Sequence, residues 1–457
     1  ARGWHGEGYR GHIFWDELII FPYLNYRAPQ ITLTLLMYRY RRLNQARKMA
    51  RELGFKGAMY PWQSGSNGRE ETQQMHLNPK SGRWLPDHSH LQRHVNVSIV
   101  YNIWQYYQIS GDFDFLSFYG AEMILEIARF FSSITIYNEE RDRFEIHGVM
   151  GPDEYHEAYP DADRPGLNNN AYTNLMVVFV MNRALELSET LTREEWYQLC
   201  EKLEVKKAEI DKWRDISRKM LIPFHGDGII SQFEGYDQLE EFDWEGYERK
   251  YGNIQRLDRI LESEGDTANR YKASKQADVL MLFYLFSSSH LESLFKQLGY
   301  VFEPDLIPKN IDYYLQRTSN GSSLSYVIHS WVAARRDRKH SWELFEEALK
   351  TDVSDIQGGT TAEGVHLGAM SGCVDIVQRG YTGLEARGNV LRFNPSFPDE
   401  LRRVKFHLRY RGHWLDLDIH ADKLKIEALK SGAHRVKVQV RDETYDLDQG
   451  RTIECAL

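Results

Sequence analysis

The hydrophobic and polar positions follow two different patterns along the chain. From about residue 17 to 380, stretches such as ITLTLLMYRYRRLNQARKMARELG and LQRHVNVSIVYNIWQYYQISGD place apolar residues at helical spacing and end at a glycine. The pattern predicts roughly a dozen helices, joined by loops that carry Gly, Pro, Asn or Asp. Paired helices with some long loops favour an α/α barrel, whose loops gather at one end and form a pocket there.

After about residue 385 the period changes to two. The stretches VLRFNPSFP, RRVKFHLRYRGHWLDLDIH and RVKVQVRDETYDL alternate apolar and polar residues and contain many β-branched side chains. Such alternation is typical of strands, and YRGHW has the residues of a hairpin turn. The sequence therefore predicts a mainly α protein, with a barrel over 1–385 and a small antiparallel β-domain over 386–457.

Composition narrows the class of function. The 57 basic and 66 acidic residues give a net charge of −9, which argues against a nucleic-acid partner because such proteins carry basic clusters. No apolar run approaches the ~18 residues of a membrane span, so we expect no membrane partner. Aromatic residues make up 13 %, and sugar faces stack on such rings, although a large helical core also contains many aromatics.

The cysteines and the first residues bear on location and processing. Cys200, Cys373 and Cys455 are far apart and odd in number, so they predict neither a disulfide framework nor a zinc site and indicate a reducing, cytoplasmic setting. No signal-peptide pattern is present. Because the chain begins ARGWHGEGYRG without a methionine, we expect it to start inside a longer precursor.

The stretch GVMGPDEYHE, residues 148–157, places three carboxylates and a histidine directly after a turn. Gly151 and Pro152 cannot continue a helix, so the acidic residues, Glu154 among them, should be presented by a loop. One interpretation is a solvated turn. The other is a site where a carboxyl group faces a pocket.

Two aromatic stretches are candidates for sugar binding. In GHIFWDE, Trp15 stands beside Asp16, which combines a flat apolar surface with a hydrogen-bond acceptor; a core tryptophan followed by a helix-capping aspartate is the alternative. In YPWQSGSNGREETQ, Trp62 and Gln63 precede a polar, glycine-rich loop that is too long for a simple turn. That loop forms either one wall of a pocket or a flexible part of the surface.

Two further stretches begin apolar helices. YKASKQADVL places Lys275 and Gln276 in the predicted first turn, where a cation opposes the helix dipole. This placement indicates an anionic or polyol partner nearby, and a solvated lysine is the alternative. In LNNNAYTN, residues 167–174, one asparagine should cap the helix, and the remaining amides suit a polyhydroxylated ligand.

The stretch DIQGGTTAEGVHLGAMSG, residues 355–372, is typical of an anion site. Gly359 and Thr360 precede a probable helix and offer backbone N–H groups and a hydroxyl, an arrangement that binds phosphate. Glu363 and His366 follow within about one turn. A glycine loop with a threonine cap and a buried glutamate is the alternative. SSLSYVIHS adds hydroxyls, including that of Ser323, before another helix.

Several common catalytic and nucleotide-binding motifs are missing. The sequence contains no GxxxxGK[ST], no GxGxxG after a strand, no HExxH and no GxSxG. These absences disfavour a nucleotide-binding protein, a zinc protease of that type and a serine hydrolase.

Taken together, the motifs ARGWHGEGYRGHIFWDE, GPDEYHE, NNNAYTN, KQADVL, SSLS and GGTTAEGVH resemble glycoside hydrolase family 65 and occur in its order. The family includes maltose, trehalose, kojibiose and nigerose phosphorylases and related hydrolases. The resemblance implies an (α/α)6 barrel followed by a small β-sandwich. It also implies an N-terminal β-sandwich, which we expect ahead of the first barrel motif, where the given sequence starts, and a homodimer.

The resemblance also implies roles for individual residues. Glu154 would be the general acid that protonates the glycosidic oxygen, while inorganic phosphate attacks the anomeric carbon from the opposite face and gives β-glucose 1-phosphate. The glucosyl ring would be held by Trp15, Asp16, Lys275 and Gln276, the acceptor side would include Trp62 and Gln63, and phosphate would be bound by Ser323, Gly359, Thr360 and His366. No metal or organic cofactor is implied.

Two alternatives to a phosphorylase remain. In an inverting hydrolase a second carboxylate must activate water, and Glu363 is the candidate base. A catalytically silent sugar-binding module is the other alternative. The intact KQAD and GGTT stretches favour phosphorolysis, and the acceptor stays open.

Overall fold

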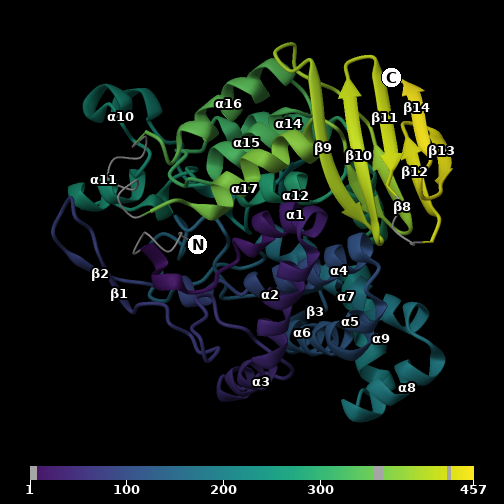
Figure 1. Cartoon of the computed structure of the whole chain (residues 1–457). Coiled ribbons are helices and arrows are strands. Elements are labelled where there is room, and N and C mark those ends of the chain that lie inside the picture. Colours follow the sequence, from purple (N-terminus) through teal and green to yellow (C-terminus); the bar gives the residue numbers. More distant parts are fainter. Residues whose placement is uncertain (1–7, 355–363, 430–433) are drawn as a thin grey trace.

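The computed structural model describes residues 8–354, 364–429 and 434–457. These residues form a mainly helical body with a β-domain packed beside it (Figure 1). The predicted mainly α class, followed by a small β-domain, is confirmed.

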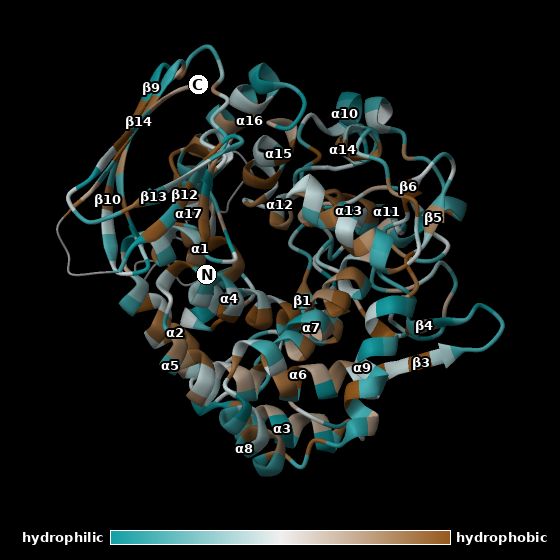
Figure 2. Cartoon of the chain, turned by 90° about the vertical axis from the view of Figure 1, so that its right-hand side faces the viewer, coloured by the Kyte–Doolittle hydropathy of each residue, from teal (hydrophilic) through white to brown (hydrophobic). Residues whose placement is uncertain are grey.

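Among the described residues, six helices close into an inner ring. Each packs against the next and the last packs against the first. Every residue from 95 to 104 and from 171 to 181 is buried, as expected for helices that are apolar on all sides. The ring consists of α1 (Glu17–Arg27), α4 (Val95–Ser110), α7 (Ala171–Thr190), α12 (Asp278–Leu285), α15 (Ser325–Ala333) and α17 (Leu367–Asp375). Figure 2 shows these apolar helices about the middle of the molecule.

A second layer of helices covers this ring and gives the (α/α)6 arrangement. Helix α2 packs on α1 and α4, α6 and α9 on α7, α14 on α12, and α16 on both α15 and α17. Their bounds are α2 (Pro29–Arg41), α3 (Leu43–Glu52), α6 (Ala121–Ile134), α9 (Lys207–Lys219), α14 (Leu306–Leu315) and α16 (Arg338–Lys350). The connections contain α5 (Phe113–Phe115), α8 (Arg193–Lys202), α10 (Trp244–Tyr251), α11 (Leu257–Glu264) and α13 (Ser288–Gln297).

The pattern over 31–54, which reads as one continuous helix, is divided in the structure. Helix α2 ends at Arg41 and α3 begins at Leu43. Between them Arg42 donates from Nε to the carbonyl of Ser66 at 2.8 Å. This tertiary contact anchors the 60–73 loop at the break between the two helices. Helical periodicity alone does not show such a contact, so it did not predict the break.

The inner helices begin at the same end of the ring. Trp15, before α1, lies against His94, before α4, with ring centroids 4.9 Å apart, and His94 lies 5.8 Å from Tyr172 in α7. Asn170, which caps α7 as predicted, donates to Asp278, the first residue of α12, at 2.5 Å. This end of the ring therefore gathers the positive ends of several helix dipoles.

The β-domain covers the opposite end of the ring. Two four-stranded sheets have the orders β14-β11-β10-β9 and β13-β12-β8-β7. Tyr26 and Ile109, near the ends of α1 and α4, join their shared core. The strands are β7 (Glu385–Arg387), β8 (Val390–Phe393), β9 (Arg403–Tyr410), β10 (His413–His420), β11 (Lys423–Ala428), β12 (Val436–Val440), β13 (Glu443–Leu447) and β14 (Thr452–Ala456).

Strand pairing matches the predicted antiparallel sandwich with one correction. The β8–β12 pair is parallel, because the chain returns to β8 only after passing through the other sheet. The predicted hairpin is confirmed, since Tyr410 pairs with His413 and Arg411 and Gly412 have φ of 47° and 84°. The first strand begins at Glu385, and we keep the division into 1–385 and 386–457 as a proposal.

Short two-stranded sheets stiffen the long loops, and the sequence pattern did not predict them. They are β1 (Met75–Leu77) with β2 (Trp84–Pro86), β3 (Thr135–Asn138) with β4 (Arg143–Ile146), and β5 (Phe224–His225) with β6 (Ile229–Ile230). Each has too few residues to show a period of two. None of the described helices has the length and apolar character needed to cross a membrane, and all three cysteines are thiols without a disulfide.

Gly57 lies in close contact with the backbone of α6, so a substitution there tests this packing. Its φ is +72°, and a Cβ there would lie 2.1 Å from the carbonyl oxygen of Glu126 and 2.5 Å from the nitrogen of Phe130, both in α6. Gly82 has the same φ with nothing within 4 Å, so it isolates the backbone strain. We expect Gly57→Ala to lower the free energy of unfolding by about 3 kcal/mol or more, and Gly82→Ala by about 1 kcal/mol. Denaturant titration measures both, and equal losses would contradict the close approach.

Candidate active site

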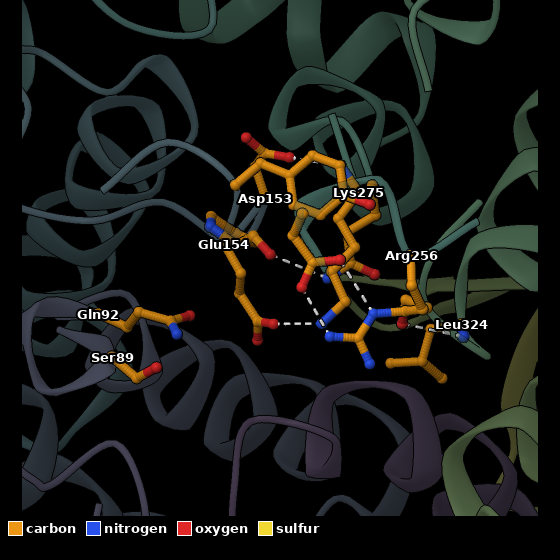
Figure 3. Close-up of polar contacts among 12 residues, drawn as sticks. Ser89, Gln92, Asp153, Glu154, Arg256, Lys275 and Leu324 are labelled. Carbon is orange, nitrogen blue, oxygen red and sulfur yellow. Dashed lines mark hydrogen bonds and ion pairs between the residues drawn. The ribbon is translucent and has the colours of Figure 1, made fainter. Parts of the chain in front are cut away.

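Glu154 stands on a backbone that L-residues rarely adopt. Its φ is +65°, a left-handed conformation that costs a non-glycine residue about 1–2 kcal/mol. Figure 3 shows its side chain pointing away from the loop, with Ser89 and Gln92 on one side and Lys275 and Arg256 on the other. Contacts around the loop must therefore offset the strain.

Asp153 supplies several of these contacts. Its Oδ1 accepts from the backbone N–H of Lys275 at 2.7 Å, and its Oδ2 accepts from Nε2 of Gln232 at 3.0 Å and lies 2.5 Å from Nδ1 of His156. Asp153 and His156 are each only 1 % exposed. Asp153 and His156 lie on the loop, as predicted, but both face inward and hold it, so the loop does not present them as it presents Glu154.

Lys275 is the ionic partner of Glu154. Its Nζ forms a salt bridge with Oε2 of Glu154. Burial alone would lower the pKa of Lys275, but the Glu154 carboxylate outweighs it and the pKa is raised. Helix α12 begins at Asp278, so the prediction that Lys275 and Gln276 lie in its first turn is wrong. They precede the helix, where the chain is free to turn toward the Glu154 loop.

Gln276 is bound to that loop as well. Its Nε2 donates to the carbonyl of Pro152 at 3.0 Å. Its Oε1 is buried and has no hydrogen-bond partner among the described residues. An unmatched acceptor on a side chain bound to the Glu154 loop suits a ligand hydroxyl.

Arg256 adds a second cation. It binds Asp258 through Nε at 3.1 Å and Nη2 at 2.7 Å. Burial lowers the pKa of Arg256, but the negative charge of Asp258 outweighs this effect and raises the pKa. Glu154 acts in the same direction with a smaller effect. The sequence analysis missed this residue because QRLDR contains nothing that separates it from an ordinary helix start.

Gln92 directs a hydrogen-bond donor at the same place. Its Oε1 lies 2.9 Å from Nε2 of His94, and burial lowers the pKa of His94 to about 3. A neutral His94 must then donate from Nε2, because Oε1 only accepts. The Gln92 amide group lies on the side of this residue that faces Glu154 (Figure 3), and its Nε2 has no partner among the described residues.

The predicted aromatic residues form a cluster beside Gln92. Trp15 and Trp62 are 4 % and 6 % exposed, and their rings lie 4.9 Å and 5.2 Å from that of His94. Asp16 is buried at the N-terminus of α1. Both tryptophans thus pack mainly against other rings, and their part in sugar binding stays a prediction.

The loop after Trp62 is anchored by hydrogen bonds to the rest of the chain. Glu70 accepts from the backbone N–H of Trp62 at 2.8 Å and of Gln63 at 3.0 Å. The side chain of Gln63 bonds to Nδ1 of His12 at 2.8 Å through Nε2. These bonds hold the loop next to the residues that precede α1, and its part in a pocket wall stays a prediction.

Part of the predicted phosphate site is placed. Ser323 is buried just before α15, and His366 caps α17 by accepting from the N–H of Ala369 at 3.2 Å. The helix thus begins at Leu367, because His366 itself is the cap. Gly359, Thr360 and Glu363 lie outside the described residues. The described residues contain no group of three or more His, Cys, Asp or Glu side chains that could hold a metal ion.

Four of the residues at this site share a position in the sequence, and this position could have been used to predict Gln92. Trp15, Gln92, Asn170 and Lys275 each lie just ahead of an apolar inner helix. A carboxyl group, a lysine and unpaired amide groups at one end of the ring can donate a proton and bind hydroxyls.

Comparison with known proteins agrees with this geometry. The chain is 50 % identical over 454 residues to an uncharacterised glycosyl hydrolase of Mycobacterium tuberculosis, covering 99 % of the chain and 34 % of that protein. It is 39 % identical over 429 residues to trehalose 6-phosphate phosphorylase of Lactococcus lactis, covering 94 % and 54 %. It is 33 % identical over 457 residues to kojibiose phosphorylase of Caldanaerobacter subterraneus, covering 98 % and 56 %. The chain thus spans a third to about half of these relatives.

A solved structure and two family profiles complete the comparison. A protein described as a "putative kojibiose phosphorylase from human microbiome" superposes with a TM-score of 0.81 at 26 % identity, covering 100 % of this chain and 62 % of that one. The profile of the glycosyl hydrolase family 65 central catalytic domain matches residues 1–375, and that of the family's C-terminal domain matches 384–447. The chain belongs to glycosyl hydrolase family 65.

Proposed function

We propose that this chain carries the phosphorolytic site of an inverting α-glucoside phosphorylase, which converts an α-glucoside and inorganic phosphate into β-glucose 1-phosphate and the free acceptor. The observation that carries the proposal is Glu154, held on a strained loop and paired with Lys275 at the end of the ring where the inner helices begin. Relatives described as trehalose 6-phosphate, kojibiose and glucosylglycerol phosphorylases support it.

In the proposed reaction Glu154 acts as general acid. Its proton passes to the glycosidic oxygen as the bond from that oxygen to the anomeric carbon breaks. An oxygen of phosphate forms the new bond to that carbon from the opposite face, which inverts the α-linkage to β. Lys275 then neutralises the carboxylate that remains. The salt bridge between the two residues is the arrangement expected after the proton has left.

The phosphate side of the proposal depends on the helix N-termini. Ser323 precedes α15 and His366 caps α17, which packs against α15. Backbone N–H groups and helix dipoles at such positions attract anions. Gly359 and Thr360 are assigned to the same phosphate from the sequence. The proposal requires no metal or organic cofactor.

On the sugar side, Lys275, Gln276, Trp15 and Asp16 are proposed to hold the glucosyl ring, and Gln92 joins them from the structure. Unpaired amide groups on Gln92 and Gln276 offer one donor site and one acceptor site to hydroxyls. Trp62 and Gln63, on the anchored loop, are proposed to face the acceptor. The identity of the acceptor is left open.

A cytoplasmic location, a homodimer and an N-terminal β-sandwich partner remain predictions.

The reaction itself is tested with a panel of α-glucosides that includes trehalose, trehalose 6-phosphate, kojibiose and glucosylglycerol. Incubation with inorganic phosphate should give β-glucose 1-phosphate from at least one of them, detected by phosphorus NMR, and omission of phosphate should stop turnover. Free glucose formed equally well without phosphate would instead identify a hydrolase. Sugar binding without any turnover would identify a silent module.

The acid is tested by Glu154→Gln, which cannot donate a carboxyl proton. Turnover of the disaccharide should fall at least about a hundredfold, with little change in melting temperature, because the side chain points away from the core. Glu157→Gln changes a neighbouring carboxyl on the same loop and should lose less than about tenfold. An active Glu154→Gln variant would remove the assigned role.

The donor on Gln92 is tested by Gln92→Ala. Loss of one hydrogen bond to a neutral hydroxyl costs about 0.5–1.5 kcal/mol, so KM for the glucoside should rise about two- to tenfold while KM for phosphate stays unchanged. Gln198→Ala, on the exposed face of α8, is the control. Equal shifts in both KM values would place Gln92 away from the sugar.

A further inference from the structure

A second carboxyl group lies directly behind the Glu154 loop. Asp278 is 1 % exposed. Its Oδ1 accepts from the backbone N–H of Asp153 at 2.6 Å, and its Oδ2 accepts from Nδ2 of Asn170 at 2.5 Å. Burial raises the pKa of Asp278 well above its ordinary value, and the charge of Asp153 acts in the same direction. Both of its carboxyl oxygens already accept from protein N–H groups, so its effect on the site passes through those neighbours.

Those neighbours connect both members of the Glu154–Lys275 pair. The backbone N–H of Asp278 donates to Oε1 of Gln232 at 3.3 Å, and Nε2 of Gln232 donates to Oδ2 of Asp153 at 3.0 Å. Oδ1 of Asp153 in turn accepts from the N–H of Lys275 at 2.7 Å. One continuous set of hydrogen bonds therefore fixes the residue before Glu154 and the backbone of its ionic partner.

Close packing makes this arrangement specific. A Cβ on Gly151 would lie 2.0 Å from Oδ2 of Asp278 and 2.5 Å from Nδ2 of Asn170. The loop backbone thus rests directly on the carboxyl–amide pair, and only glycine fits there. Three residues further along, Glu154 takes its left-handed φ of +65°. A loop pressed against fixed partners has no room to relax into a common conformation.

We propose that Asp278 and Asn170 form a positioning pair that holds Glu154 in its strained, proton-donating geometry. The proposal rests on the proposed function, in which Glu154 is the general acid. Asn170 also caps α7 by accepting from the N–H of Thr173 at 2.9 Å, so a purely structural role is the competing explanation. The pair joins the starts of α7 and α12 to the Glu154 loop. Its carboxyl and amide groups can be swapped between positions 278 and 170 by mutation.

A reciprocal exchange separates the two explanations. Asp278→Asn brings an amide against the Asn170 amide, and Asn170→Asp brings two carboxyl groups together. The double variant restores one amide and one carboxyl, and the cap of α7 is kept, because aspartate is as good an N-cap as asparagine. We expect each single variant to lose about a hundredfold in kcat on the disaccharide, with KM for phosphate nearly unchanged, and the double variant to regain at least about tenfold.

The leaving group supplies the readout that a structural role would not move. Fluoride departs from α-glucosyl fluoride with little help from an acid, whereas a sugar alkoxide needs the proton. Misplacement of Glu154 should therefore slow the disaccharide much more than the fluoride. Equal losses on both substrates, or a double variant no better than the single ones, would overturn the proposal.

Two controls keep the test decisive. Asp112→Asn alters a carboxylate that accepts from the N–H of Phe115 and the hydroxyl of Tyr106, each at 2.9 Å, at the far end of α4. It should leave the rates unchanged. If a single variant does not fold, Gln232→Met removes the contact to Asp153 at similar volume. This variant should also lose more activity on the disaccharide than on the fluoride. Equal losses on the two substrates in Gln232→Met would overturn the proposal.

Crystal structures of the variants separate this proposal from the proposed function. Glu154 should leave its left-handed φ and its contact with Lys275 in the single variants and return in the double variant. If the unaltered protein turns over no glucoside, the proposed function fails, yet these structures still decide whether the pair positions Glu154. An unmoved Glu154 in both single variants would reject the pair.

Discussion

Closure of the apolar inner helices into a ring is the constraint on which the rest of the structure depends. Helices buried on every side, such as α4 and α7, can be covered only by other elements all around them. Successive inner helices also begin at one end, so their dipoles, caps and preceding residues converge there, while the β-domain covers the other end. The candidate site is therefore a consequence of closure, and its residues come from segments that are far apart in the sequence.

The site combines a strained residue with a buried, hydrogen-bonded support. Glu154 bears the left-handed backbone, and buried carboxyl and amide groups behind it, centred on Asp153 and Asp278, supply the hydrogen bonds that hold the loop. A buried polar group is stabilising only when its partners are in place, so such a network tolerates a single arrangement. The same bonds that hold the loop also set the backbone of Lys275. Stability and the geometry of proton transfer are thus coupled in one network.

Sequence reasoning reached the features that local pattern encodes. Period and turn residues predicted the helices, the strands and the hairpin at Arg411–Gly412, and the asparagine run contained the cap of α7. It did not find Asp278, because the importance of this residue comes from contacts across long separations: Asp278 and Asp153 are 125 residues apart. Arg256 was missed because its local stretch resembles an ordinary helix start, and Gln92 was missed although it lies just ahead of an apolar inner helix. Sequence reasoning also placed Lys275 inside a helix, since apolar periodicity does not show that Asp278 is the first helical residue.

The central claim is that Glu154 faces a glucosyl unit across from phosphate at the end of the ring where the inner helices begin. A crystal structure with a slowly reacting α-glucoside and phosphate tests it most directly. The account predicts the glycosidic oxygen at about 3 Å from a carboxyl oxygen of Glu154, with phosphate on the opposite face of the sugar near Ser323 and His366. Sugar and phosphate on the same face, or either one bound at the end covered by the β-domain, would contradict it.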